Sequence, residues 1–110
     1  MSIIKSHPVQ KRINGVIVNV SETSIVSENE YSTTGEECIV VKSIPCSILL
    51  DNKTTEHVVI KCLTQTTIKP NIGKIDEEYD EIVADKGACI EFRCIEGNWY
   101  ILSSDGLKFS

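Results

Sequence analysis

Large side chains that could fill a protein core are scarce in this sequence. Aromatic residues make up only 5% of the 110 residues, with a single Trp, whereas hydrophobic residues as a whole reach an ordinary 41%. The core must therefore be built mainly from Ile and Val, whose β-branched side chains favour strands. This length has room for one domain, so the composition predicts a single all-β domain.

Long hydrophobic runs are also lacking. No stretch approaches the roughly 20 apolar residues that a membrane-spanning helix needs. Residues 1–8 do not contain the apolar segment of a secretory signal peptide. We therefore expect no membrane insertion and no secretion, and a chain that is made in a cytosol and kept there or in particles assembled there.

An excess of positive charge is missing too. The net charge is −5 and the isoelectric point is about 5.0. Such a surface repels phosphate backbones, and Lys and Arg gather only in the short segment from Lys5 to Arg12. The charge balance argues against a nucleic-acid partner.

Closely spaced metal ligands are absent. The cysteines are odd in number, which argues against a disulfide framework in a chain that is not secreted, and none forms a C-x-x-C pair. His57 and Cys62 are five residues apart, as are Cys89 and Cys94, and in a strand this odd separation turns two side chains to opposite faces. We expect no metal and no cofactor, and structural free thiols at Cys38, Cys46, Cys62, Cys89 and Cys94.

Catalytic patterns are weak. Cys62, His57 and Asp51 supply the residue types of a nucleophilic triad, but no nucleophile elbow surrounds them and apolar neighbours raise a thiol pKa. The sequence predicts a protein that is not an enzyme, with no catalytic residue. A small enzyme that uses Cys62 or Cys94 is the competing hypothesis.

The acidic segment from Asp76 to Glu81 imitates a calcium loop only in part. Its acidic residues alternate as the first three ligands do, but the position that requires Gly is Glu81 and the position that requires Glu is Gly87. A solvated acidic face is therefore predicted in place of a cation site.

Short β-branched segments recur about every ten residues, separated by polar turns, which is typical of all-β domains. Residues 1–12 lack any periodicity and are predicted to form an N-terminal arm, followed by one β domain over residues 13–110. Ala88 to Ile95 alternates most clearly, and Glu96-Gly97 then turns the chain. The predicted strands are 13–20, 25–26, 38–43, 47–50, 57–63, 67–69, 88–95 and 98–103.

Residues 75–86 allow two interpretations. Ile75, Tyr79, Ile82 and Val83 lie on one face of a helix, and Gly87 is a suitable C-terminal cap. The alternative is an acidic loop that leads into a strand at residues 81–84. Local pattern alone does not separate the two.

Several predicted strands are apolar on both faces, as in residues 16–18, 39–41 and 58–60. A single small sheet buries only one face of each strand. The second apolar face indicates cover by other subunits, while a two-layer sandwich with thick loops is the competing explanation.

Several segments from about Tyr31 onward follow one another in a distinctive order. They are residues 39–41, 46–50, Val58-Val59-Ile60-Lys61, Thr67-Ile68-Lys69-Pro70, Ile75-Asp76, residues 88–92 and the closing Gly97-Asn98-Trp99-Tyr100-Ile101-Leu102. In these segments the chain resembles a β-rich domain of tailed-phage tail-fibre proteins and of virion proteins of large DNA viruses. The family has Gly where this chain has Glu77, and usually Pro where it has Asp51.

The resemblance implies a compact, short-stranded β-sandwich or β-prism-like domain that assembles as a parallel homotrimer. It also implies loop and strand, not helix, for residues 75–86. The expected function is that of a non-enzymatic structural protein of a virus particle, a capsid component or a fibre-like trimer. Its expected partners are further copies of itself and other virion proteins. The alternative is an attachment module that binds a host surface glycan or receptor.

Bulky residues of the closing hairpin and of the central strands are the candidates for anchoring the core and the subunit interface. Trp99 and Tyr100 offer, as an alternative, a platform on which a sugar could stack. The structural and interface candidates are Trp99, Tyr100, Ile101, Phe92, Ile90, Ile60 and Val58.

Overall fold

The computed structural model describes residues 3–5, 9–13 and 16–108, and within them every element is a strand. The all-β prediction is confirmed. In this part of the chain no helix is long and apolar enough to cross a membrane. The strands are β1 (Ile3–Lys5), β2 (Val9–Ile13), β3 (Val16–Ser21), β4 (Thr23–Val26), β5 (Glu30–Ser32), β6 (Cys38–Val41), β7 (Cys46–Leu50), β8 (His57–Cys62), β9 (Thr66–Pro70), β10 (Ile82–Ile95) and β11 (Asn98–Lys108).

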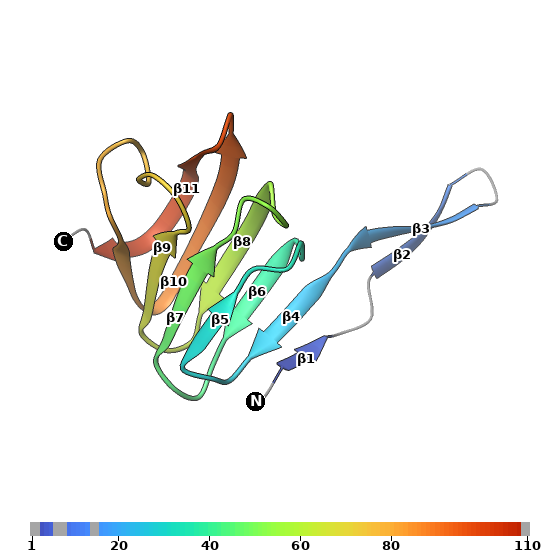
Figure 1. Cartoon of the computed structure of the whole chain (residues 1–110). Coiled ribbons are helices and arrows are strands. Elements are labelled where there is room, and N and C mark those ends of the chain that lie inside the picture. The colour runs from blue at the N-terminus through green and yellow to red at the C-terminus, as the bar shows by residue number, and fades with distance from the viewer. Residues whose placement is uncertain (1–2, 6–8, 14–15, 109–110) are drawn as a thin grey trace.

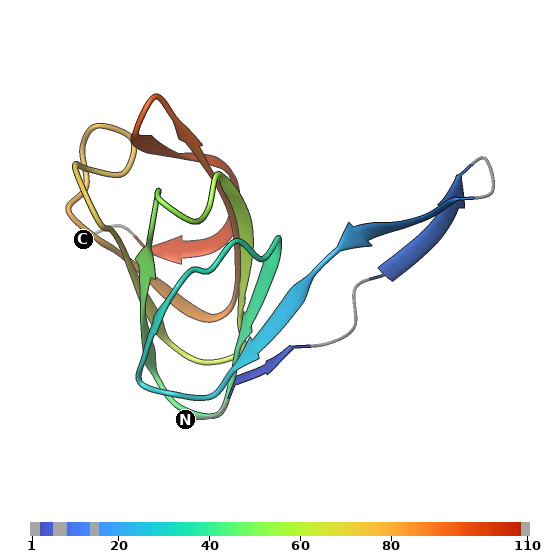
Figure 2. The same ribbon diagram turned by 45° about the vertical axis from the view of Figure 1, so that its right-hand side comes forward.

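The chain winds as a flattened coil with two facing layers (Figures 1 and 2). Strands β4, β6 and β8 run parallel to one another in the first layer, and β5, β7 and β9 run parallel in the second. Each strand of the first layer is followed in the sequence by one of the second, so parallel neighbours are joined through the opposite layer.

Strand β10 joins the two layers into one nine-stranded sheet. Its start, Ile82 to Ala84, pairs antiparallel with β9, and its later part, Cys89 to Arg93, pairs antiparallel with β8. Strand β11 pairs with β10 on both sides of an irregularity between Ala84 and Cys89. The two strands predicted at 81–84 and 88–95 are therefore one element.

Residues 75–81 form a turn and loop, as the resemblance implies, and the helical interpretation of residues 75–86 is wrong. The backbone N–H of Tyr79 donates to the carbonyl of Ile75 at 2.9 Å, but Asp76 and Glu77 have φ values of 54° and 59°. Left-handed residues end a right-handed helix at once. From Ile82 onward the chain pairs as β10 with β9 and β11, and this pairing overrides the helical periodicity of the local sequence.

The core lies between the layers and consists largely of isoleucine ladders. Ile39, Ile60 and Ile90 occupy paired positions on β6, β8 and β10 in the first layer. A matching row on β7, β9 and β10 faces them from the second layer, with Ile48, Ile68 and Ile82 in register. All six side chains are fully buried. Close burial of this apolar surface is the main favourable term for the fold.

Of the arm predicted at residues 1–12, residues 1–2 and 6–8 lie outside the described residues, and residues 3–5 and 9–12 are in strands. Strand β1 pairs antiparallel with β4 and therefore belongs to the nine-stranded sheet, which we call the body of the protein. Strands β2 and β3 form a hairpin that projects from the body and leads almost directly into β4 (Figures 1 and 2). The strand predicted at 13–20 thus corresponds to β3, and the boundary predicted between residues 12 and 13 falls within the hairpin.

The closing turn has the predicted hairpin geometry. Glu96 and Gly97, with φ values of 52° and 81°, form the two-residue connection between Ile95 and Asn98, which are opposite each other. Two positive φ values in a two-residue loop match the twist of paired strands. The turn thereby places Trp99 opposite Cys94 on the inner side of the hairpin.

Candidate functional site

The predicted anchors divide into a buried set and a half-buried set. Trp99, fully buried, joins the core through a bridge with Ile75, and its indole Nε1 has no hydrogen-bond partner. It is therefore not available as a sugar-stacking platform. Tyr100 and Ile101 are half-buried on the same strand. The remaining anchors, Phe92, Ile90, Ile60 and Val58, are fully buried between the layers. A role for any of them in a subunit interface stays a prediction.

The outer face of the first layer carries a group of apolar side chains, with Lys61 opposite Val40 and Glu91 opposite Val59. Ile25 lies opposite Val40, and Cys38 lies opposite Val59, on the adjacent strands β4, β6 and β8. All of these side chains are half-buried although no other element covers them in the described part of the chain. Contiguous exposed apolar surface is typical of interaction sites. We call Ile25, Val40, Val59 and Cys38 the apolar face.

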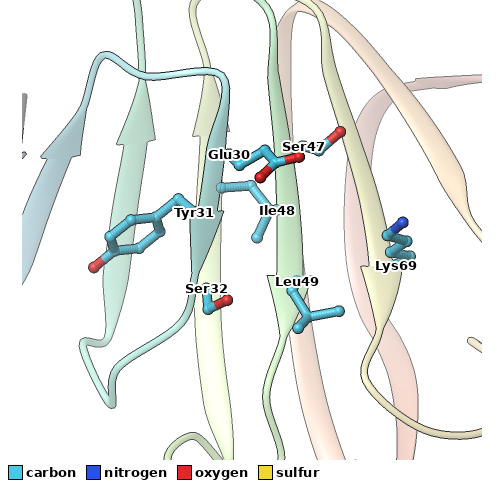
Figure 3. Close-up of a pocket in the computed structure, with 7 residues that line it drawn as sticks. All are labelled: Glu30, Tyr31, Ser32, Ser47, Ile48, Leu49 and Lys69. Atoms are coloured by element: carbon cyan, nitrogen blue, oxygen red, sulfur yellow. The ribbon is translucent and has the colours of Figure 1, made fainter. Parts of the chain in front are cut away.

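A groove lies on the second layer, beside the edge strand β5 (Figure 3). Its volume is about 230 Å³, and its walls mix polar and apolar side chains. Glu30 and Ser47 are register partners, and Lys69 lies across β7 on β9. The lining residues are Glu30, Tyr31, Ser32, Ser47, Ile48, Leu49 and Lys69. The groove presents one acidic and one basic group to a polar ligand.

Glu36 is a fully buried carboxylate at the open end of the two layers. Its Oε2 accepts hydrogen bonds from Ser24 Oγ at 2.9 Å and from the Tyr31 hydroxyl at 2.5 Å. The backbone N–H of Thr34 donates to Oε1 at 2.8 Å, and the Thr34 hydroxyl donates to Oε2 at 2.9 Å. Burial opposes ionisation of Glu36, but these four donors outweigh it and lower the pKa of the carboxyl.

Sequence reasoning missed Glu36. It stands in a polar segment with no periodicity, where a glutamate is normally a surface residue. Only the meeting of β4 and β5 with the loop before β6 surrounds it with donors. Because four hydrogen bonds from Ser24, Tyr31 and Thr34 already surround its carboxylate, Glu36 is best understood as a structural tie between the layers.

The cysteines have the properties of structural thiols. No disulfide forms among them. Burial raises the pKa of the Cys46 thiol to about 11, and burial also raises the pKa values of Cys62 and Cys38. A raised pKa leaves little thiolate at neutral pH, which disfavours nucleophilic chemistry.

His57 has a partner, but it is not arranged as a catalytic base. Its Nε2 lies 2.6 Å from Glu91 Oε2 on the neighbouring strand, and the Ser103 hydroxyl donates to the other oxygen of Glu91 at 3.1 Å. In a catalytic triad the histidine stands between the nucleophile and the acid. Here the acid stands in the middle. The hydrogen bonds from His57 and Ser103 lower the pKa of Glu91.

The acidic loop at residues 76–81 makes contacts with protein groups. Asp76 Oδ1 accepts a hydrogen bond from the backbone N–H of Ile101 at 2.9 Å, and Lys74 pairs with Asp80 at 2.7 Å. Across residues 22–106, no group of three or more His, Cys, Asp or Glu side chains is arranged to hold a metal ion. Asp76 thus fastens the loop to β11.

Comparison with protein-family models, with curated proteins and with solved structures finds no match for this chain. The surfaces described above are therefore the basis for any statement about function.

Proposed function

We propose that this chain is a non-enzymatic structural protein of a virus particle and that it assembles as a parallel homotrimer. The observation that carries the proposal is the apolar face of Ile25, Val40, Val59 and Cys38. Burying such a face against another copy removes apolar surface from water at about 25 cal/mol per Å². The resemblance of residues 31–102 to virion domains supports the particle as its location.

The absence of a built catalytic centre in the described residues agrees with a packing role, although it does not test that role. Burial raises the pKa of the Cys62 thiol, and His57 is bound to Glu91. What the fold offers to a partner is surface: the apolar face on one layer and the groove on the other.

The test is the solution mass by light scattering on a sizing column, across a hundredfold dilution. The expected result is a stable mass near three times 12.2 kDa. Val40→Glu should dissociate the trimer, because a charge on the apolar face would lose its hydration in the interface. In the free subunit this charge is tolerated, since Val40 is half-buried and lies opposite Lys61.

The matched control is Val83→Glu. Val83 is also a half-buried valine on an outer face, but it belongs to the part of β10 that pairs with β9 in the second layer. This variant should remain trimeric. A wild-type monomer at every dilution would refute the trimer, and dissociation by both variants would refute the assignment to the apolar face.

The groove beside β5 favours the second candidate function, an attachment module for a host glycan. Glu30, Ser47 and Lys69 provide acceptors and donors of the kind that hydroxyl-rich ligands need. Binding of the wild type and of Lys69→Ala to a glycan array tests whether the groove binds a glycan. Reproducible binding that is lost in the variant would support attachment, and an empty array would reject it.

A further inference from the structure

Among the described strands, the projecting β2–β3 hairpin does not pair with the body of its own subunit. Strand β2 pairs with β3 in a separate two-stranded sheet, and neither strand pairs with any strand of the nine-stranded sheet. Both views show the hairpin standing clear of the two layers (Figures 1 and 2). A two-stranded ribbon is marginally stable in water by itself. Strands β2 and β3 would therefore be stabilised by a docking surface elsewhere.

Charge indicates what kind of surface this is. The first 21 residues contain Lys5, Lys11 and Arg12 and no acidic residue. All 16 Asp and Glu residues of the chain lie from Glu22 onward. The hairpin is thus basic and the body is strongly acidic, and opposite charges steer and stabilise association. The body of another copy is a partner of the required charge.

The open edge of β5 is the matching place on that body. Strand β5 ends the strand order of the sheet and pairs only with β7 among the described strands. Its other edge is open, and an open edge is a template for a further strand. Glu30 is exposed on this strand, and the half-buried Glu28 lies two residues before it.

A hairpin cannot reach this edge within its own subunit. It leaves the body at β4 in the first layer, and in Figure 2 it points away from the layer that contains β5. The partner must therefore be a second subunit.

We propose that the β2–β3 hairpin of one copy adds to the open edge of β5 of a neighbouring copy, so that the positive charge of the hairpin lies close to the negative charge of Glu28 and Glu30. This inference rests on the proposed homotrimer and names a contact that holds it together. In a trimer, each copy gives its hairpin to the next, so a ring of three exchanges closes and leaves no hairpin unpaired.

The test uses charge reversal in the full chain. The variant Lys11→Glu/Arg12→Glu and the variant Glu28→Lys/Glu30→Lys should each dissociate at a concentration about tenfold higher than the wild type, because attraction becomes repulsion at every exchange. An equimolar mixture of the two should recover the wild-type mass, since each hairpin then meets an edge of opposite charge. Circular dichroism establishes that each variant is folded.

Two further measurements locate the effect. The control variant Lys53→Glu/Lys86→Glu has the same net charge as Lys11→Glu/Arg12→Glu, but its substitutions are at two exposed lysines of the body. It should dissociate over the same concentration range as the wild type. Hydrogen exchange at the amides of Glu30 and Ser32, which face away from β7, should be slow in the wild type. It should become at least about tenfold faster when the basic pair is reversed, because the edge amides lose their partners.

The outcomes separate this inference from the proposal on which it rests. A wild-type trimer whose mass and exchange are the same in all variants would refute the hairpin exchange and leave the apolar face as the interface. Dissociation without recovery on mixing, or equal dissociation of the Lys53/Lys86 control, would also refute it. A monomeric wild type would refute both the exchange and the trimer.

Discussion

The Tyr31 hydroxyl donates to Glu36 Oε2 at 2.5 Å, and this contact ties the second layer to the loop that precedes β6. Ser24 on β4 donates to the same oxygen. One buried carboxylate thus joins strands of both layers at the end where no β10 closes the sheet. A buried charge with complete hydrogen bonding rigidifies its surroundings, and removal of one partner is costly.

Substitution at this tie should destabilise the fold in a graded way. Tyr31→Phe removes one of four donors and should lower the free energy of unfolding by about 1–2 kcal/mol. Glu36→Ala leaves all the donors without their acceptor and should cost about 3 kcal/mol or more. Urea unfolding measures both. Glu37→Ala is the control, since this neighbouring glutamate is exposed and its loss should change stability by less than about 0.5 kcal/mol. Equal effects at positions 36 and 37 would contradict the structural role of Glu36.

The same tie predicts how stability depends on pH. Because the hydrogen bonds lower the pKa of Glu36 from its ordinary 4.5, its contribution is present above that value and is lost as the pH falls through the folded pKa. Burial and the bond to Glu36 raise the pKa of Tyr31 from 10.0, so its contribution is present below that value and is lost as the pH rises further. Thermal midpoints across the pH range should fall at both ends. Glu36→Gln should flatten the acid side, and an unchanged acid side would exclude Glu36 as its cause.

Glu77→Gly should stabilise the protein. Glu77 has a φ of 59°, a left-handed conformation that costs a residue with a Cβ about 1–2 kcal/mol. Glycine removes that cost but raises the entropy of the unfolded chain, so a net gain of about 0.5–1 kcal/mol is expected. Glu78→Gly in the same turn has no positive φ to relieve and should destabilise by a similar amount. Thermal unfolding compares the two, and a loss of stability in both would contradict this account of the turn.

Trp99→Phe should cost less than the size of the side chain suggests. The indole Nε1 is buried without a hydrogen-bond partner, and an unpaired buried donor is itself unfavourable by about 1–3 kcal/mol. Phenylalanine removes that donor while keeping much of the packing, whereas Trp99→Ala should cost about 3–5 kcal/mol. Denaturant titration of both variants tests this difference. Equal losses of stability in the two variants would mean that the unpaired indole N–H does not destabilise the native protein.

Alkylation of the native protein should be slow at Cys46 and Cys62. Both thiols are buried, and burial raises the pKa of Cys46 to about 11. Mass spectrometry after timed exposure to iodoacetamide gives the rate at each cysteine. The half-buried Cys89 and Cys94 should react first because reagent access is greater there, whereas Cys38 belongs to the apolar face and should be covered in the trimer. A rapid, selective reaction at Cys62 would support the enzymatic alternative.

The amino-acid sequence by itself determined the fold class and the positions of most strands. The β-branched segments around Val40, Ile48 and Ile60, and the alternation of Ile90 and Phe92, are local patterns that each predict a strand without reference to the rest of the chain. The turn at Glu96-Gly97 is equally local. These predictions succeeded because the alternation of apolar side chains and the residue preferences of a turn each depend on only a few neighbouring residues.

Only the tertiary structure decided how the strands are arranged and which polar residues matter. The parallel pairing of β4 with β6 and of β5 with β7 depends on contacts between distant segments, and the edge strand at Tyr31 has polar neighbours that hide it from pattern analysis. Residues 75–86 follow a helical period locally, but strand pairing through β10 overrides it. Thr34 and Tyr31, which are close to Glu36 in the sequence, supply three of its four hydrogen bonds, and folding brings Ser24 of β4 to complete the set. A contact with a distant strand, and the burial that it produces, leave no mark on the local sequence.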